Sequence, residues 1–272
     1  SSFATDLSLE SMQKYKDELK TKKRKKLIFK LAILGVAGIA IFIGTFYFLF
    51  FAKVFDVRFI SIDTPDGLHD SLSRVVNDWL DAGFWKMTRR NNIFFASTSE
   101  LTSHLAKQFP KLESININRD FPHGLLLTAT ERQPTGIWCQ TVQDKCFYFD
   151  KNGIAFSETQ PSAGFLITNI DDKRTRKITL GSQIVGEDWL KNILSAKELL
   201  AKIDINISEF VIPADSFDEF HAKTAEGWTI MFSVQTDIEK QINALATFLK
   251  EKIKPDQKAQ LQYIDLRIQD RI

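Results

Sequence analysis

The sequence predicts an α+β fold that follows a single N-terminal transmembrane helix. Three observations predict this class. Residues 31–52 form an apolar run, and residues 53–133 contain two stretches with apolar residues at helical spacing between stretches in which apolar and polar residues alternate. In residues 134–272 this strand-like alternation predominates. We therefore expect a basic tail (1–30), a membrane helix (31–52), a compact β-α-α-β-β domain (53–133) and a β-rich domain with flanking helices (134–272).

The charge of the chain is concentrated in the tail. Residues 1–30 hold nine of the 36 Lys and Arg residues and four of the 34 Asp and Glu residues, which leaves 27 basic and 30 acidic residues in the remainder. A domain that binds nucleic acid normally carries a basic excess, so the sequence disfavours this class of partner for the folded part.

The membrane helix is predicted by residues 31–52, a run of 22 residues without a charge. At about 1.5 Å rise per residue the helix is about 33 Å long, which matches the hydrocarbon core of a bilayer. The run is longer than the apolar part of a signal peptide, and no small-x-small cleavage site follows it. We therefore expect an anchor and not a cleaved signal.

The orientation follows from the basic residues on either side of this run. Five of them stand together at Lys22–Lys26 and Lys30 follows, whereas Lys53 and Arg58 are the basic residues just after the run. The positive-inside rule places the N-terminus in the cytoplasm and residues 53–272 outside it. The expected protein is a bitopic protein of the cytoplasmic membrane.

The first extracytoplasmic domain is expected to open with a strand at residues 57–62 and a turn at 65–67. Apolar residues at helical spacing then predict a helix from Leu68 to Leu80, closed by Gly83. A capping box at 97–100 predicts a second helix that Pro110 stops. Strands at 112–117 and 125–129, with a turn at 121–124, complete the β-α-α-β-β order.

The second domain is expected to begin with a hairpin whose arms include residues 138–139 and 146–149. A turn at 150–153 and a strand at 154–156 follow, then a helix from about Glu187 to Ile203 and strands near 208–212, 220–223 and 228–234. A capping box at Thr236–Glu239 opens a helix that stops before Pro255. Apolar and polar residues then alternate over 263–272, which predicts a last strand.

The two cysteines, Cys139 and Cys146, would stand opposite each other if residues 141–144 form the hairpin loop. Directly opposed residues lie ~4.5–5.5 Å apart at Cα, within disulfide range. Export to an oxidising compartment makes a bond plausible, and two free thiols are the equally open alternative. A metal site at this pair is disfavoured.

The sequence contains none of the familiar catalytic patterns. Gly-x-Ser-x-Gly and P-loop motifs are absent, and the four histidines have no metal-ligand spacing: His69, His104, His123 and His221. We therefore expect no enzyme activity, no metal and no other cofactor.

Four short motifs occur in order behind the membrane helix. They are Arg119-Asp120-Phe121-Pro122, Glu131-Arg132-Gln133-Pro134, Asp150-Lys151-Asn152-Gly153 and Tyr263-Ile264-Asp265-Leu266-Arg267. Together they resemble the FtsQ/DivIB family of bacterial cell-division proteins. The chain departs from the family pattern in the long loop 84–95 and in the cysteine pair.

The resemblance implies a POTRA domain (polypeptide-transport-associated) at 53–133 and a β domain at 134–272. It also implies a divisome scaffold for septum formation that links early and late assembly proteins. Its expected partners are the small bitopic proteins FtsB (or DivIC) and FtsL, and the last strand is the place where a partner adds.

A physical argument supports the same strand without the resemblance. A strand at a sheet edge offers unpaired N–H and C=O groups to a partner strand, although an ordinary closing strand explains the same pattern. The candidate partner-binding residues are Tyr263, Asp265, Leu266, Arg267, Ile268, Gln269 and Arg271.

Two other functions remain open at this point. A POTRA-containing adaptor of another envelope or secretion system would use the same kind of domain, although no strand series typical of an outer-membrane barrel follows it here. A membrane-anchored cell-wall hydrolase would require histidines and carboxylates that converge in the fold.

Overall fold

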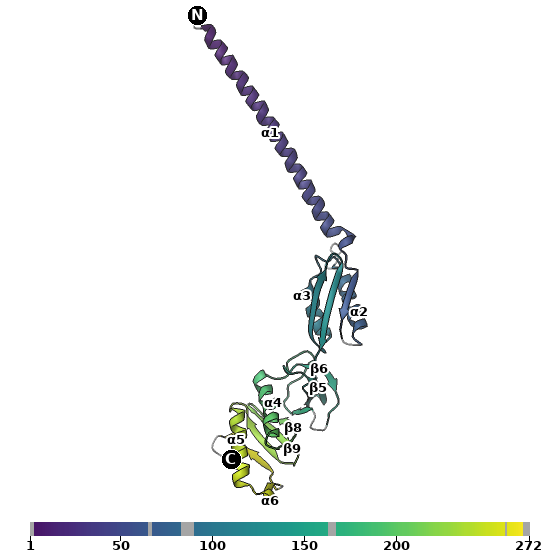
Figure 1. The fold of residues 1–272 in the computed structure, drawn as a ribbon, viewed down its shortest axis with the longest axis vertical. Coiled ribbons are helices and arrows are strands. Elements are labelled where there is room, and N and C mark those ends of the chain that lie inside the picture. The colour runs from purple at the N-terminus through teal and green to yellow at the C-terminus, as the bar shows by residue number, and fades with distance from the viewer. Residues whose placement is uncertain (1–2, 65–66, 83–89, 163–166, 259, 269–272) are drawn as a thin grey trace. The chain divides into compact units, whose positions relative to one another are not determined.

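A computed structural model describes residues 3–64, 67–82, 90–162, 167–258 and 260–268 (Figure 1). By the density of their contacts these residues form two compact units. The first unit comprises residues 1–60, 79–97 and 119–125, and the second comprises 61–78, 98–118 and 126–272. The division into domains at residues 30, 52 and 133 stays a prediction.

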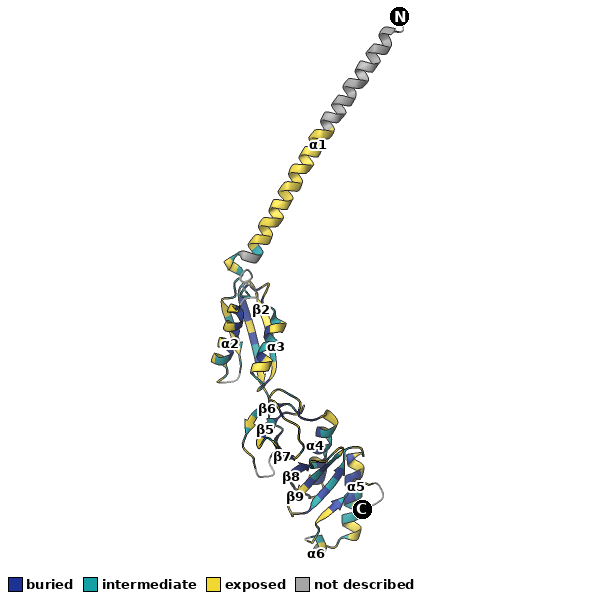
Figure 2. Ribbon diagram, turned by 180° about the vertical axis from the view of Figure 1, so that it is seen from behind, coloured by how far each residue is buried: buried dark blue, intermediate teal, exposed yellow. Residues whose placement is uncertain are grey.

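The N-terminal helix α1 runs from Phe3 to Phe51. Its stretch Arg24–Leu49 is long and apolar enough to cross a membrane, and Figure 2 shows that the residues of this stretch are exposed almost throughout. A surface of this kind is stable in lipid and costly in water, so the helix is consistent with a single N-terminal transmembrane span. The helix ends one residue earlier than expected, because Ala52 already has an extended backbone.

A short 3-10 helix, η1 (Lys53–Phe55), leads into a three-stranded sheet with the order β1-β3-β2. The elements are β1 (Phe59–Asp63), α2 (His69–Asp81), α3 (Thr98–Gln108), β2 (Leu112–Asp120) and β3 (Gly124–Glu131), so the predicted β-α-α-β-β order is confirmed. Gly83, the expected end of the first helix, lies outside the described residues.

The helices beside this sheet bury the residues that their spacing selects. Leu72 and Val76 of α2 and Leu101 and Leu105 of α3 are buried, each pair being four residues apart and therefore on one helix face. On β3 the buried residues Leu125, Leu127 and Ala129 alternate with more exposed ones, as expected for a strand with one covered face.

The remaining strands form one eight-stranded sheet with the order β11-β10-β9-β8-β7-β4-β5-β6. The strands are β4 (Gly136–Gln140), β5 (Lys145–Phe149), β6 (Ala155–Thr159), β7 (Thr168–Asp172), β8 (Ile207–Ile212), β9 (Glu219–Thr224), β10 (Thr229–Ser233) and β11 (Tyr263–Asp265). Strand β7 was not expected from the sequence. It pairs in parallel with both β4 and β8 in the middle of the sheet.

Two helices, α4 (Glu187–Ala201) and α5 (Ile238–Lys252), share one core with this sheet, and the short helix α6 (Pro255–Lys258) follows α5. Leu200 of α4 and Leu245 of α5 are fully buried, as are Phe220 and Phe232 of the sheet, whose rings stack 5.1 Å apart. The core therefore lies between the helices and one face of the sheet.

Two predicted boundaries need correction. The α5 N-cap is Asp237 and not Thr236, because the Asp237 carboxylate accepts hydrogen bonds from the backbone N–H groups of Glu239 and Lys240. Helix α4 ends at Ala201, two residues before the predicted Ile203, and is followed by a turn in which Asp204 adopts φ 58°.

Candidate functional site

The candidate site is the edge formed by β11, the outermost strand of the eight-stranded sheet. Strand β11 pairs in parallel with β10, with Tyr263 beside Thr229, Ile264 beside Ile230 and Asp265 beside Met231. Within the described residues no other strand lies on its far side, so its outer backbone groups face away from the sheet.

The hydrogen bonds to β10 identify which backbone groups these are. Thr229 N–H donates to the Gln262 carbonyl at 3.0 Å, and Leu266 N–H donates to the Met231 carbonyl at 2.9 Å. Residues of a strand alternate between its two edges, so 262, 264 and 266 face β10. Tyr263 and Asp265 therefore direct their N–H and C=O groups outward.

The side chains of β11 and the residues after it divide between core and solvent. Ile264 and Leu266 are each 4% exposed and belong to the core below the helices. Tyr263 and Ile268 are 59% and 57% exposed. Of the candidate partner-binding residues, Leu266 thus stabilises the strand from inside, whereas Tyr263 and Ile268 present apolar surface to solvent.

The last strand is shorter than the sequence pattern indicates. It ends at Asp265, because the Asp265 carboxylate accepts a hydrogen bond from the backbone N–H of Arg267 at 3.0 Å and turns the chain. The expected continuous strand over 263–272 is wrong for residues 266–268. Gln269 and Arg271 lie outside the described residues.

A charged cluster holds the chain at this turn. The Arg267 guanidinium donates to both oxygens of Asp265, at 2.9 and 2.6 Å, and also to Glu219 of β9, which is 48 residues earlier in the sequence. The hydrogen bond from Arg267 lowers the pKa of Asp265, and the bonds to Asp265 and then Glu219 raise the pKa of Arg267. The cluster fastens the end of β11 across two neighbouring strands.

His221 joins this cluster from β9. It stands beside Met231 in the β9–β10 register, and Met231 stands beside Asp265, so the three residues form a row on one face. Burial lowers the pKa of His221, while the carboxylate of Glu219, with its nearer oxygen 3.6 Å from Nε2, acts in the opposite sense. Neither Glu219 nor His221 was singled out from the sequence as a site residue.

The two cysteines meet in the β4–β5 hairpin. Cys139 and Cys146 stand directly opposite each other and are joined by a disulfide with Cα atoms 3.9 Å apart. Of the two alternatives left open by the sequence, a disulfide and two free thiols, the structure contains the disulfide. The disulfide joins two neighbouring strands of the sheet, its cysteines are seven residues apart, and it is distant in sequence from β11.

Two of the sequence motifs meet at a buried ion pair. Arg132 of the Glu-Arg-x-Pro segment donates to Asp150 of the Asp-x-x-Gly turn and, at 3.0 Å, to the Pro110 carbonyl. The other Asp150 oxygen accepts from Asn152 N–H and Ile154 N–H. Asp150 is 2% exposed and both its carboxylate oxygens accept hydrogen bonds within the protein, so its role is structural.

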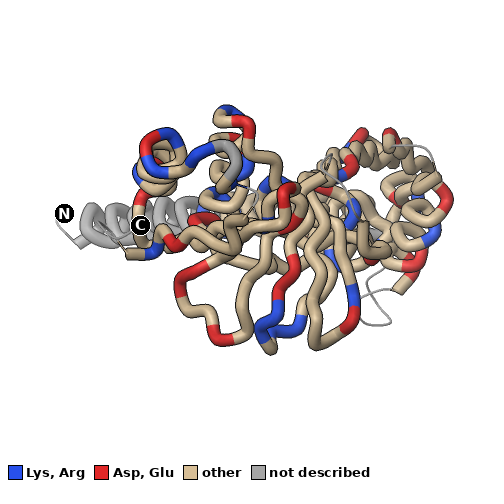
Figure 3. Tube along the Cα trace, turned by 90° about the horizontal axis from the view of Figure 1, so that it is seen from below, with Lys and Arg blue, Asp and Glu red and all other residues tan. Residues whose placement is uncertain are grey.

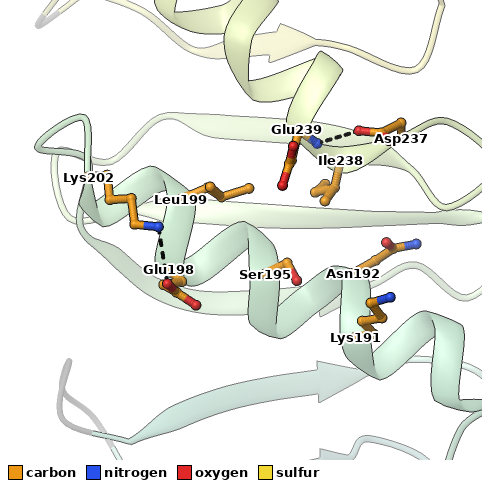
Figure 4. A pocket seen from close by; sticks show the side chains of 9 residues that line it. All are labelled: Lys191, Asn192, Ser195, Glu198, Leu199, Lys202, Asp237, Ile238 and Glu239. Atoms are coloured by element: carbon orange, nitrogen blue, oxygen red, sulfur yellow. Dashed lines mark hydrogen bonds and ion pairs between the residues drawn. The ribbon is translucent and has the colours of Figure 1, made fainter.

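An open groove of about 320 Å³ lies between α4 and the start of α5 (Figure 4). Three of its charged groups already have partners, since Lys202 pairs with Glu198 at 3.2 Å and Asp237 caps α5. In the part of the chain that the structure describes, no three His, Cys, Asp or Glu side chains gather to hold a metal ion. Figure 3 shows acidic and basic positions interspersed along the described chain. The β11 edge, therefore, is the feature best suited to binding.

Part of the chain is similar to a curated protein of known family. The chain is 28% identical over 176 residues to a curated cell division protein FtsQ of Geobacter sp. (strain M21). The match covers 60% of this chain and 58% of that relative, so the chain spans less than two thirds of the relative's length. No family model matches the chain.

Proposed function

Because this similarity supports membership of the FtsQ/DivIB family of bacterial cell-division proteins, we propose that the chain is a non-enzymatic, membrane-anchored scaffold of the divisome. It anchors through α1 with its N-terminus in the cytoplasm and acts at the division site. Its partners are small bitopic division proteins of the FtsB/DivIC and FtsL types, which it links to the rest of the septum-assembly machinery.

The observation that carries the binding part of the proposal is the unpaired outer edge of β11. A partner segment in extended conformation would add as a ninth strand and hydrogen-bond to the backbone of Tyr263 and Asp265. Tyr263 would supply apolar contact beside this ladder. Arg267 would fix the edge through its bonds to Asp265 and Glu219, so that little conformational freedom is lost on binding.

The test uses the full chain in detergent micelles and measures its affinity for the FtsB/DivIC-type and FtsL-type proteins of the same organism. The informative variant is Tyr263→Pro, which deletes an outward N–H and leaves the bonds to β10 intact. We expect binding to weaken about tenfold or more, since a ladder bond is lost and the proline ring obstructs the added strand.

The matched control is Tyr263→Val, which removes the same ring but keeps the backbone donor and favours a strand. It should bind several-fold more tightly than Tyr263→Pro. Equal affinities of the two variants would contradict strand addition at β11. Failure of the unmodified chain to bind either partner would contradict the proposed partnership itself.

Leu266→Pro is a less selective probe of this edge. In the unmodified chain the Leu266 N–H donates to the Met231 carbonyl inside the sheet, and the Leu266 side chain is part of the core. This variant should detach β11 and destabilise the whole sheet, so any loss of binding by Leu266→Pro needs an unfolding measurement beside it.

A further inference from the structure

A second surface lies in the first compact unit, where four exposed phenylalanines and one half-buried one gather at the C-terminal end of α1. We define the aromatic patch as Phe48, Phe55, Phe59, Phe94 and Phe121. Four of these rings form a continuous chain: Phe48 to Phe55 at 5.8 Å, Phe55 to Phe94 at 5.1 Å and Phe94 to Phe121 at 5.7 Å. The fifth, Phe59, packs against His123 at 5.3 Å.

These rings are far more exposed than core aromatics. Phe59 is 65% exposed, Phe121 is 59% exposed and Phe94 is 42% exposed, whereas Phe149 and Phe232 of the large core are fully buried. Exposed apolar surface that is continuous over several aromatic rings marks a site for lipid or for another protein. Phe48 belongs to the membrane-crossing stretch itself, so the patch is a direct extension of the apolar surface of α1.

The backbone that carries the patch is tied firmly to the end of α1. Asn92 Nδ2 donates to the Leu49 carbonyl at 3.3 Å, and Ile93 N–H donates to the Phe55 carbonyl at 2.9 Å. Arg58 N–H donates to the His123 carbonyl at 2.9 Å. Three separate chain segments are therefore held together where the helix leaves its apolar stretch.

The charges around the patch favour an anionic surface. In residues 52–60, 90–97 and 119–125 there are four basic side chains, Lys53, Arg58, Arg90 and Arg119, and two acidic ones, Asp56 and Asp120. Lys53 and Arg58 are exposed. Aromatic side chains bordered by Lys and Arg are typical of protein surfaces that lie in the headgroup region of a bilayer.

We propose that the aromatic patch is a lipid-binding surface that inserts into the membrane interface and docks the first unit on the bilayer. Phe59, Phe94 and Phe121 enter the boundary between headgroups and acyl chains, while Lys53 and Arg58 contact lipid phosphates. The patch thus holds the first unit at the membrane surface more tightly than the covalent link to α1 alone would do. This proposal does not depend on a role in cell division.

The test reconstitutes the full chain in nanodiscs that contain anionic lipid, without any partner protein. A cysteine at Phe121→Cys, labelled under non-reducing conditions so that Cys139–Cys146 stays bonded, carries an environment-sensitive fluorophore. Lipids with a nitroxide at an upper acyl carbon quench it only if it enters the bilayer. We expect blue-shifted emission and several-fold stronger quenching than with the same label at Phe217→Cys, a site that is 90% exposed and lies outside the patch.

A second variant separates insertion from mere proximity to α1. Phe59→Ser combined with Phe94→Ser should abolish the quenching of the label at 121, whereas Phe217→Ser should leave it unchanged. Circular dichroism melting checks that these variants fold. Equal quenching at 121 and 217, or a label at 121 that is shielded only after division partners are added, would overturn the proposal, and the latter result would assign the patch to protein.

Discussion

At the scale of single residues, Gly136 shows how closely β4 is packed. A Cβ at this position would lie 2.4 Å from the Phe149 ring and 2.5 Å from the Thr168 carbonyl oxygen. The ring belongs to a fully buried side chain and the carbonyl belongs to the neighbouring strand β7, so neither can move without disturbing the sheet. Only glycine fits between them.

We predict that Gly136→Ala lowers the free energy of unfolding by about 3 kcal/mol, because overpacking forces the β4, β5 and β7 backbones apart. Chemical denaturation of the purified chain measures this change. The control is Gly186→Ser, at the α4 N-cap, where nothing lies within 4 Å of the added Cβ and serine is a good cap. Similar losses in both variants would contradict the packing argument.

At the scale of elements, we expect the stability of the sheet at the end of β11 to depend on pH through His221. Because burial lowers the pKa of His221 below 6.5, its usual value, the unfolded chain binds a proton more readily than the folded chain. The contribution of His221 to stability is then fully present above pH 6.5 and is lost as the pH falls through the lowered pKa. Glu219, Asp265 and Arg267 are the charged groups that act on this ring.

We predict that His221→Gln makes the stability of the second unit less dependent on pH just below 6.5. Thermal unfolding at a series of pH values between neutrality and mild acid measures this slope. Lys223→Gln, also on β9, is the control, because the Lys223 side chain pairs with Glu209. An unchanged slope in His221→Gln would mean that other groups govern the acid response.

Most elements could be predicted because their patterns are local. Helices α2 and α3 carry apolar residues at helical spacing, and the β4–β5 hairpin, with its cysteines opposite each other, follows from strand alternation around a short loop. Strand β7 was missed since Thr168–Asp172 contains one strongly apolar residue, Ile170, and its strand conformation comes from pairing on both sides.

The candidate site was only partly predictable for a related reason. The alternation of residues 263–272 indicated a strand and its position suggested an edge, but alternation does not reveal the side-chain bond by which Asp265 turns the chain. The contributions of Glu219 and His221 come from β9 and depend on the order of strands in the sheet. Strand order is a tertiary property that a single sequence does not display.

At the scale of the whole molecule, the proposed orientation rests on the basic residues before α1. We predict that alkaline phosphatase fused after Ile272 is active in cells, because this reporter folds only outside the cytoplasm. Replacement of Lys22–Lys26 by glutamine should reduce that activity by weakening the orientation signal. Replacement of Lys53 and Arg58 by glutamine, which leaves that signal intact, is the control, and an inactive fusion of the unmodified chain would refute the orientation.

The position of β11 in chain order also has a consequence for the timing of assembly. This strand leaves the ribosome after all the other strands of its sheet, and it supplies both the outward edge and two core side chains, Ile264 and Leu266. A chain interrupted before Tyr263 lacks the proposed docking strand and exposes the edge of β10 in its place. Synthesis of β11 would then act as a checkpoint, since only molecules that contain this strand could recruit a partner at its edge, and those without it would expose an open sheet edge to proteolysis.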